Sequence, residues 1–236
     1  MTKIVISSKP LNKITTDLVV AVVDPNEALF QSDNDSELSK KLSSAIRAFR
    51  NGNCRKEFLH HFDNNNSAKA LLVFLSSSQR GHDLLESIKI FAARSLSVAS
   101  DYGYSRVTFL LNGDKGINFV GAVTEGFVLG DYRFDKYLRE KSAPKIKVEL
   151  VCKKQVRRKA NRELKRAQII SHEVNRARDL VNEPGDQVYP STLARFARKI
   201  AKDRNLGIAV IRGAQLEKQR YNGLVAVGKG SVYPPC

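Results

Sequence analysis

The sequence has few of the features that place a chain in a membrane, outside the cell or in a fibre. No apolar run in its 236 residues reaches the roughly 18 residues that a membrane-spanning helix needs. The N-terminal segment MTKIVISSKPLNKITTDL lacks a long apolar stretch with a small-residue cleavage site, so a secretory signal is not expected. With 14 Gly and 7 Pro, the composition excludes collagen-like and low-complexity classes. A globular protein without a membrane partner is expected.

Cysteine is also scarce. The three cysteines, Cys54, Cys152 and Cys236, lie far apart and are odd in number, which fits free thiols better than a disulfide framework. None of them has the C-x-x-C spacing of a zinc site. Because free thiols persist in a reducing compartment, we predict a cytoplasmic protein.

Negative charge is rare in the last third of the chain. Residues 1–150 carry 21 Lys and Arg against 17 Asp and Glu, whereas residues 151–236 carry 19 against 7. The formal net charge of the whole chain is +16. Such asymmetry favours contact with nucleic acid, and an acidic surface elsewhere in the same protein would explain it equally well.

The first 152 residues alternate between short apolar runs and amphipathic segments. Strands are expected at 3–7, 18–23, 69–75, 106–111 and 146–152. Helices are expected at 36–52, 83–102 and 117–134, and the last contains Gly121, Gly126 and Gly130, which weaken a helix but permit close packing. Residues 53–67, with three consecutive Asn, are expected to form a loop. Near-continuous apolar strands separated by helices predict an α/β fold with a mostly parallel sheet covered by helices.

One long helix is expected over residues 156–182. Its apolar positions, Val156, Ala160, Leu164 and Ala167, fall on one side at helical spacing. Six basic residues fall on the opposite side: Arg157, Arg158, Lys159, Arg162, Lys165 and Arg166. This basic face could neutralise several phosphates of DNA without reading sequence, or it could be a solvated face or a contact with a neighbouring acidic surface.

A second region follows the break at Pro184–Gly185. Its pattern predicts a helix at 191–202, a strand at 207–212, a short helix at 214–220 and a strand at 223–228. This is a βαβ unit whose strands need further strands beside them. Three parts are therefore expected: an N-terminal α/β domain at 1–152, a linking helix at 153–184, and an incomplete domain at 185–236.

Specific motifs flank the linking helix. The stretch ARDLVNEPGDQVYPSTLARFA (177–197), with AVGKGS (226–231) after it and EGFVLGDYRFDKY (125–137) before the helix, resembles the leucyl aminopeptidase family, also called cytosol aminopeptidases. Departures from the family pattern are Gly185–Asp186, Tyr189 and Lys229. The resemblance implies an N-terminal macro-like domain joined by the helix to the start of an α/β peptidase domain.

The resemblance also implies a function. Family members are cytoplasmic homo-hexameric exopeptidases that remove N-terminal amino acids from peptides with two divalent ions, Mn²⁺ or Zn²⁺. Their ligands and catalytic residues lie in motifs like "GKG-FD-GG" and "NTDAEGR", which are not found between residues 1 and 236. We therefore assign no catalytic or metal-binding residue, expect no metal in this chain, and predict that the polypeptide as given ends before the active site and is inactive.

Other candidate ligands are isolated. His60 and His61 are adjacent and would point in different directions on a strand or helix. Asp179 and Glu183 have i, i+4 spacing, but Pro184 ends the helix there and no third ligand is evident. The alternative to a peptidase is thus a non-catalytic regulatory or DNA-binding module that uses the basic helix face at 157–166.

Overall fold

The computed structural model describes residues 2–10, 13–23, 57–62, 68–75, 82–111, 116–139 and 145–236, together with four single residues between 40 and 47. The described residues form two compact units, Met1–Asn175 and Arg176–Cys236. Most of the helix expected at 36–52, and Cys54, lie outside the described residues.

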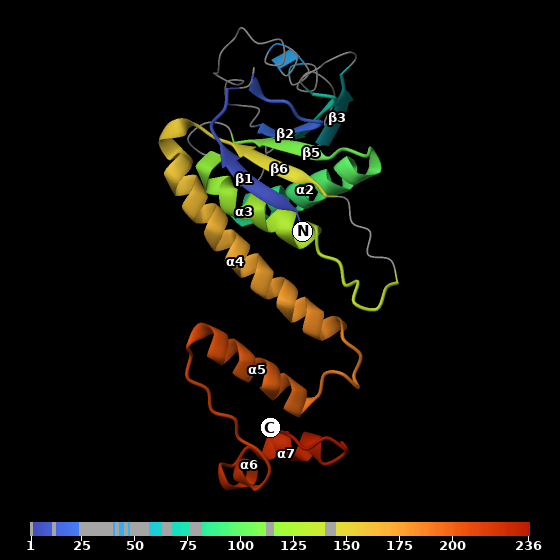
Figure 1. The fold of residues 1–236 in the computed structure, drawn as a ribbon, viewed down its shortest axis with the longest axis vertical. Coiled ribbons are helices and arrows are strands. Elements are labelled where there is room, and N and C mark those ends of the chain that lie inside the picture. The colour runs from blue at the N-terminus through green and yellow to red at the C-terminus, as the bar shows by residue number, and fades with distance from the viewer. Residues whose placement is uncertain are drawn as a thin grey trace. The chain divides into compact units, whose positions relative to one another are not determined.

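The first unit is built on a six-stranded sheet in the order β1-β6-β5-β2-β4-β3 (Figure 1). All of its neighbouring strands run parallel except β3 and β4, which are antiparallel. The strands are β1 (Lys3–Ser7), β2 (Leu18–Val23), β3 (Glu57–His61), β4 (Ala70–Leu75), β5 (Arg106–Leu110) and β6 (Lys147–Val151). The predicted mostly parallel sheet is confirmed, and so are its five predicted strands.

The strand β3 corrects the loop expected at 53–67. Its sequence EFLHH is half polar and lacks a continuous apolar run, so pattern alone does not indicate a strand. The antiparallel ladder to β4 supplies the hydrogen bonds that make it the edge strand of the sheet.

Two helices, α2 (His82–Asp101) and α3 (Gly116–Gly130), pack on the same side of the sheet (Figure 1). Alternate strand residues such as Ile4 and Ile6 are buried in the core between the sheet and these helices, whereas Lys3 and Val5 are exposed on the other face. In this core, Phe109 of β5 contacts the rings of Phe91 in α2 and Phe127 in α3, so aromatic contacts join both helices to the sheet.

The long helix α4 (Arg157–Asn182) follows β6 after a short 3₁₀ turn, η2 (Lys154–Val156). Ala160 and Leu164 belong to the same core as the sheet, and Asn175 donates from its side-chain amide to the carbonyl of Val128 in α3 at 3.2 Å. The prediction of a helix with one apolar side is confirmed.

The second unit contains the end of α4 and the helices α5 (Pro190–Arg204), α6 (Ala214–Lys218) and α7 (Asn222–Gly228). The predicted break and restart are confirmed, because α4 ends before Pro184 and α5 begins at Pro190. At that start the N–H of Tyr189 donates to Thr192 Oγ1 at 2.9 Å.

The prediction of two strands in this unit is wrong. Residues 207–212 form no regular element, and the segment expected to be a strand at 223–228 lies in α7. A strand needs a neighbour for its backbone N–H and C=O groups, and within the described residues neither segment has one. A helix pairs its own backbone groups, which is why GLVAVG can be helical despite its β-branched residues.

Candidate functional site

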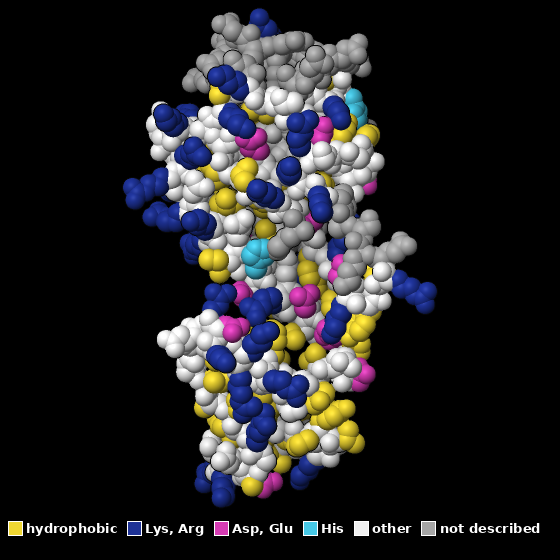
Figure 2. All heavy atoms as spheres, in the orientation of Figure 1, with side chains coloured by type: hydrophobic (Ala, Val, Ile, Leu, Met, Phe, Trp, Pro, Cys, Tyr) yellow, Lys and Arg dark blue, Asp and Glu magenta, His cyan; other side chains and the backbone are white. Residues whose placement is uncertain are grey.

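The basic face of α4 is the site predicted from the sequence, and the structure exposes it. All six predicted residues are exposed: Arg157, Arg158, Lys159, Arg162, Lys165 and Arg166. The opposite side of the helix buries Ala160, Leu164 and Ala167. In Figure 2, Lys and Arg side chains project at the left edge, where α4 begins in Figure 1.

No described acidic residue forms an ion pair with these six cations. In the part of the chain that the structure describes, none of them lies within ion-pair distance of a carboxylate. Fully solvated cations along two and a half helical turns provide a surface that attracts polyanions without sequence preference. The structure thus brings the predicted residues together but gives them no specific ligand.

A metal centre does not fit the described residues. No group of three or more His, Cys, Asp or Glu side chains among them could hold a metal ion. His61 contacts the hydroxyl of Tyr104 at 3.4 Å and packs against the Tyr102 ring at 4.8 Å, so its surroundings are aromatic rather than acidic. Two divalent ions close together would require a dense set of oxygen donors, which these residues do not supply.

Asp17 is the carboxylate with the densest set of partners in the first unit. Its Oδ2 accepts hydrogen bonds from the N–H groups of Ser105 and Arg106, both at 2.9 Å, and its Oδ1 lies 3.0 Å from Lys69 Nζ. Burial alone would raise the pKa of Asp17, but the hydrogen bonds from Lys69 and the two backbone N–H groups outweigh it, and the pKa is lowered. Both carboxylate oxygens of Asp17 thus have partners inside the protein, which assigns this side chain a structural role.

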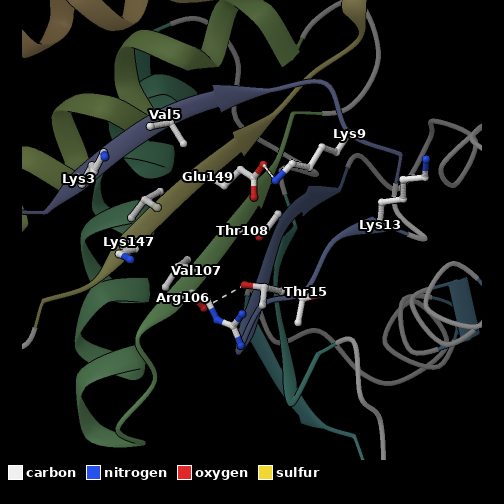
Figure 3. Close-up of a pocket in the computed structure, with 12 residues that line it drawn as sticks. Lys3, Val5, Lys9, Lys13, Thr15, Arg106, Val107, Thr108, Lys147 and Glu149 are labelled. Atoms are coloured by element: carbon white, nitrogen blue, oxygen red, sulfur yellow. Dashed lines mark hydrogen bonds and ion pairs between the residues drawn. The ribbon is translucent and has the colours of Figure 1, made fainter.

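A second group of basic residues lies on the face of the sheet away from α2 and α3, and no sequence pattern indicated it. A groove of about 470 Å³ there is lined by Lys3, Lys9, Lys13, Arg106 and Lys147, with Glu149 as its acidic residue (Figure 3). In the sequence, each of these cations is an isolated basic residue in or beside a strand or turn. Only the strand register places them side by side.

The second unit has an apolar hollow of about 440 Å³ beside α5. It is lined by Val188, Tyr189, Pro190, Leu193, Ala194, Ala197 and Cys236. Tyr189 stacks on Tyr233 with ring centroids 4.1 Å apart, and Cys236 Sγ contacts the carbonyl of Pro190 at 3.1 Å. These contacts fold the last residues back onto the start of α5, and no charged group lines the hollow.

Comparison with known proteins identifies the family. The family model described as "Cytosol aminopeptidase family, catalytic domain" matches residues 175–236, beginning within one residue of the second compact unit. The probable cytosol aminopeptidase of Geotalea uraniireducens is 32% identical over 235 residues, which cover 96% of this chain and 47% of that protein. The chain belongs to the cytosol aminopeptidase family.

A further relative supports the assignment to the cytosol aminopeptidase family. The probable cytosol aminopeptidase of Persephonella marina is 38% identical over 115 residues, which cover 48% of this chain and 23% of that protein. The matched part of the chain thus covers from 23% to 47% of the length of these two curated relatives. Both relatives are named probable cytosol aminopeptidases, and the cytoplasmic location of this protein remains a prediction.

Solved structures share the fold. A mutant of tomato leucine aminopeptidase superposes with a TM-score of 0.74 at 17% identity, covering all of this chain and 49% of that one. The bottromycin maturation enzyme BotP in complex with Mn superposes with a TM-score of 0.64 at 23% identity, covering 93% of this chain and 44% of that one. In the described residues of the present structure, no helix is both long and apolar enough to cross a membrane.

Proposed function

We propose that this family member acts in peptide breakdown as a metal-dependent leucyl aminopeptidase, which removes N-terminal amino acids from peptides. The observation that carries the proposal is the 32% identity that extends over 96% of the chain to a probable cytosol aminopeptidase. The match of residues 175–236 to the catalytic-domain model of the family supports it. On this proposal, residues 1–152 are a macro-like N-terminal domain, and the helix within residues 153–184 connects it to the beginning of the peptidase domain.

The proposal assigns no catalytic step to residues 1–236. The described residues do not fit a two-metal centre, so the ions, Mn²⁺ or Zn²⁺, would be held outside the described residues. When bound, such ions supply an activated water and polarise the scissile carbonyl. The described part of the chain contributes the scaffold, and the homo-hexamer and cytoplasmic location implied by the family are part of the same proposal.

The experiment compares two polypeptides. Residues 1–236 and a version extended through the downstream reading frame are purified, supplied with Mn²⁺ or Zn²⁺, and assayed with a leucine anilide. We expect metal-dependent turnover only from the extended polypeptide. Turnover that copurifies with residues 1–236 would contradict the assignment of the metal site, and an extended polypeptide without peptidase activity would contradict the proposed function.

A second candidate function is DNA binding by the basic face of α4. It is favoured by six exposed cations that have no carboxylate partner among the described residues. The groups are arranged along one helix face and no aromatic side chain interleaves them, so phosphate neutralisation rather than base stacking would provide the affinity.

Gel-shift titrations at several salt concentrations test this candidate. Changing Arg157, Arg158 and Arg162 to Ala should weaken binding and reduce the slope of log affinity against log salt by about 3, since each phosphate contact contributes roughly 0.9. The matched control changes three exposed cations of α5, Arg195, Arg198 and Lys199, to Ala. An equal loss in both variants would show a non-specific charge effect and exclude the α4 face as the binding site.

A further inference from the structure

The groove lined by Lys3, Arg106 and Lys147 carries an inference that is independent of peptidase activity. It lies on the side of the sheet away from α2 and α3, since Lys3 and Val5 are exposed while Ile4 and Ile6 between them are buried in the core. Figure 3 shows its walls, with Lys3, Lys147 and Arg106 on three neighbouring strands and Lys9 and Lys13 on the segment after β1.

Three of these cations form a row that the strand register dictates. Lys3 of β1 pairs with Lys147 of β6, and Lys147 pairs with Arg106 of β5. Side chains at paired positions point to the same face, and neighbouring strands are roughly 4.8 Å apart, so the row spans about 10 Å. Like charges placed directly opposite each other destabilise a sheet unless an anion lies between them.

The fold provides little neutralisation for this row. Within the described chain, Lys3, Lys13 and Lys147 have no carboxylate within ion-pair distance. Arg106 lies 3.9 Å from Asp17, whose same oxygen is held by Lys69 at 3.0 Å. The acidic residue of the groove, Glu149, pairs with Lys9 at 3.3 Å. Among the described residues, five cations and one carboxylate therefore line a concave surface, which is an arrangement that concentrates anions.

We propose that this groove binds a short chain of condensed phosphates, of the kind found in tripolyphosphate or in the triphosphate part of a nucleotide. A volume of about 470 Å³ is that of a small-molecule site. A row of cations about 10 Å long matches an anion whose charges are spread along a chain rather than gathered at one point. None of the described residues that line the groove is aromatic, so the ligand is recognised through its phosphates and not by stacking of a base.

Isothermal titration of residues 1–236 with sodium tripolyphosphate at low ionic strength tests the proposal. Lys147→Gln removes the central cation of the row and should weaken binding about tenfold, the effect of losing one charge-assisted contact. Lys3→Gln is a second variant at the edge of the sheet with the same expected direction. Lys154→Gln, an exposed cation of η2 outside the groove, is the matched control and should leave the affinity unchanged.

A variant that is expected to tighten tripolyphosphate binding, rather than weaken it, makes the test more stringent. Glu149→Gln removes the carboxylate of the groove and releases Lys9, so it should tighten tripolyphosphate binding severalfold. Glu217→Gln in α6 makes the same charge change in the other unit and should have no effect. Thermal unfolding midpoints within a few degrees of the parent chain show that each variant is folded.

Further titrations distinguish the sources of the ligand. Equal affinity for tripolyphosphate and a nucleoside triphosphate supports a phosphate chain as the recognised group, and tighter binding of the nucleotide identifies that source. Orthophosphate should bind much more weakly than either. Equal losses in Lys147→Gln and Lys154→Gln, or no measurable heat with tripolyphosphate, would overturn the proposal. Duplex DNA that displaces tripolyphosphate and depends on Lys147 would overturn it in favour of a nucleic-acid surface.

Discussion

At the residue scale, Asp17 shows how one buried carboxylate joins three strands. Its side chain accepts the N–H groups of Ser105 and Arg106 at the start of β5, and its carbonyl accepts the N–H groups of Lys69 and Ala70 at the start of β4. Asp17 itself immediately precedes β2. One residue thus fixes the amino ends of three central strands, and a buried charge is tolerated because all of its acceptors are occupied.

Asp17→Asn should destabilise the first unit by about 1–3 kcal/mol, because the N–H donors lose a charged acceptor and Lys69 loses its partner. Chemical denaturation at pH 7 measures the change. Lys9→Gln, which removes the more exposed ion pair to Glu149, is the control and should cost under about 1 kcal/mol. A loss for Asp17→Asn no larger than that of the control would contradict the structural role.

The same residue predicts a pH dependence. The pKa of Asp17 is lowered in the folded state from 3.8, so the unfolded chain binds a proton first as the pH falls. Its contribution to stability is present above pH 3.8 and is lost as the pH falls through the lower, folded-state pKa. The difference in unfolding free energy between the parent and Asp17→Asn should therefore shrink below about pH 4 and stay level from pH 5 to 7. A difference that grows on acidification would refute this.

At the scale of elements, the contact between α2 and α3 depends on glycines. A Cβ built on Gly126 would collide with the carbonyl oxygen of Lys89 and lie 2.8 Å from Ala92 Cβ, and one on Gly130 would lie 2.8 Å from Ala93 Cβ. A Cβ on Gly121 meets nothing within 4 Å. The close packing predicted for this helix is thus provided by Gly126 and Gly130, and Gly121 does not contribute.

Gly126→Ala and Gly121→Ala should therefore have opposite effects. The first forces the two helices apart and should destabilise the protein by about 1–3 kcal/mol or more. The second replaces glycine in an open helical position and should stabilise it by about 0.5–1 kcal/mol. Thermal and denaturant unfolding of both variants measure the two changes in stability. Stabilisation of equal size in the two would show that backbone propensity, not helix contact, decides the outcome.

At the scale of the whole molecule, the two units differ in how much apolar surface they bury. The sheet and its helices enclose a core that includes Ala160 and Leu164 of α4, whereas the second unit buries few residues, among them Ala194, Ala201 and Leu216. Exposed large apolar residues gather in the second unit, including Leu206, Leu224, Val227 and Val232. Such surface is typical of a region that needs a partner to be stable.

Limited proteolysis should therefore remove the second unit first. Since α4 packs into the core of the first unit as far as Asn175, the resistant fragment should end near residue 175 rather than at 152, the boundary expected from the sequence. Mass spectrometry of a time course with a protease of broad specificity locates this C-terminal cut. A resistant fragment that keeps residues 176–236 intact, or one that ends near 152, would contradict the expectation.

Strong local patterns in the sequence predicted much of this structure. Apolar runs such as LVVAVV predicted the central strands, and the spacing of Ala160, Leu164 and Ala167 predicted the two faces of α4. These predictions succeed because the pattern of a buried strand or an amphipathic helix lies within one continuous segment. The edge strand β3 was missed because its ladder comes from β4, and 223–228 was assigned the wrong element because β-branched residues form strands only beside other strands.

Of the two basic surfaces, one could be predicted from the sequence and the other could not. The face of α4 follows from the sequence alone, since its six cations are close in sequence and helical geometry fixes their directions. The groove on the sheet does not, because Lys3, Arg106 and Lys147 come from strands about 40 to 145 residues apart along the chain. Family membership could likewise be predicted from the sequence, because its motifs are contiguous. Strand order and register, in contrast, depend on long-range hydrogen bonds that form only in the folded sheet.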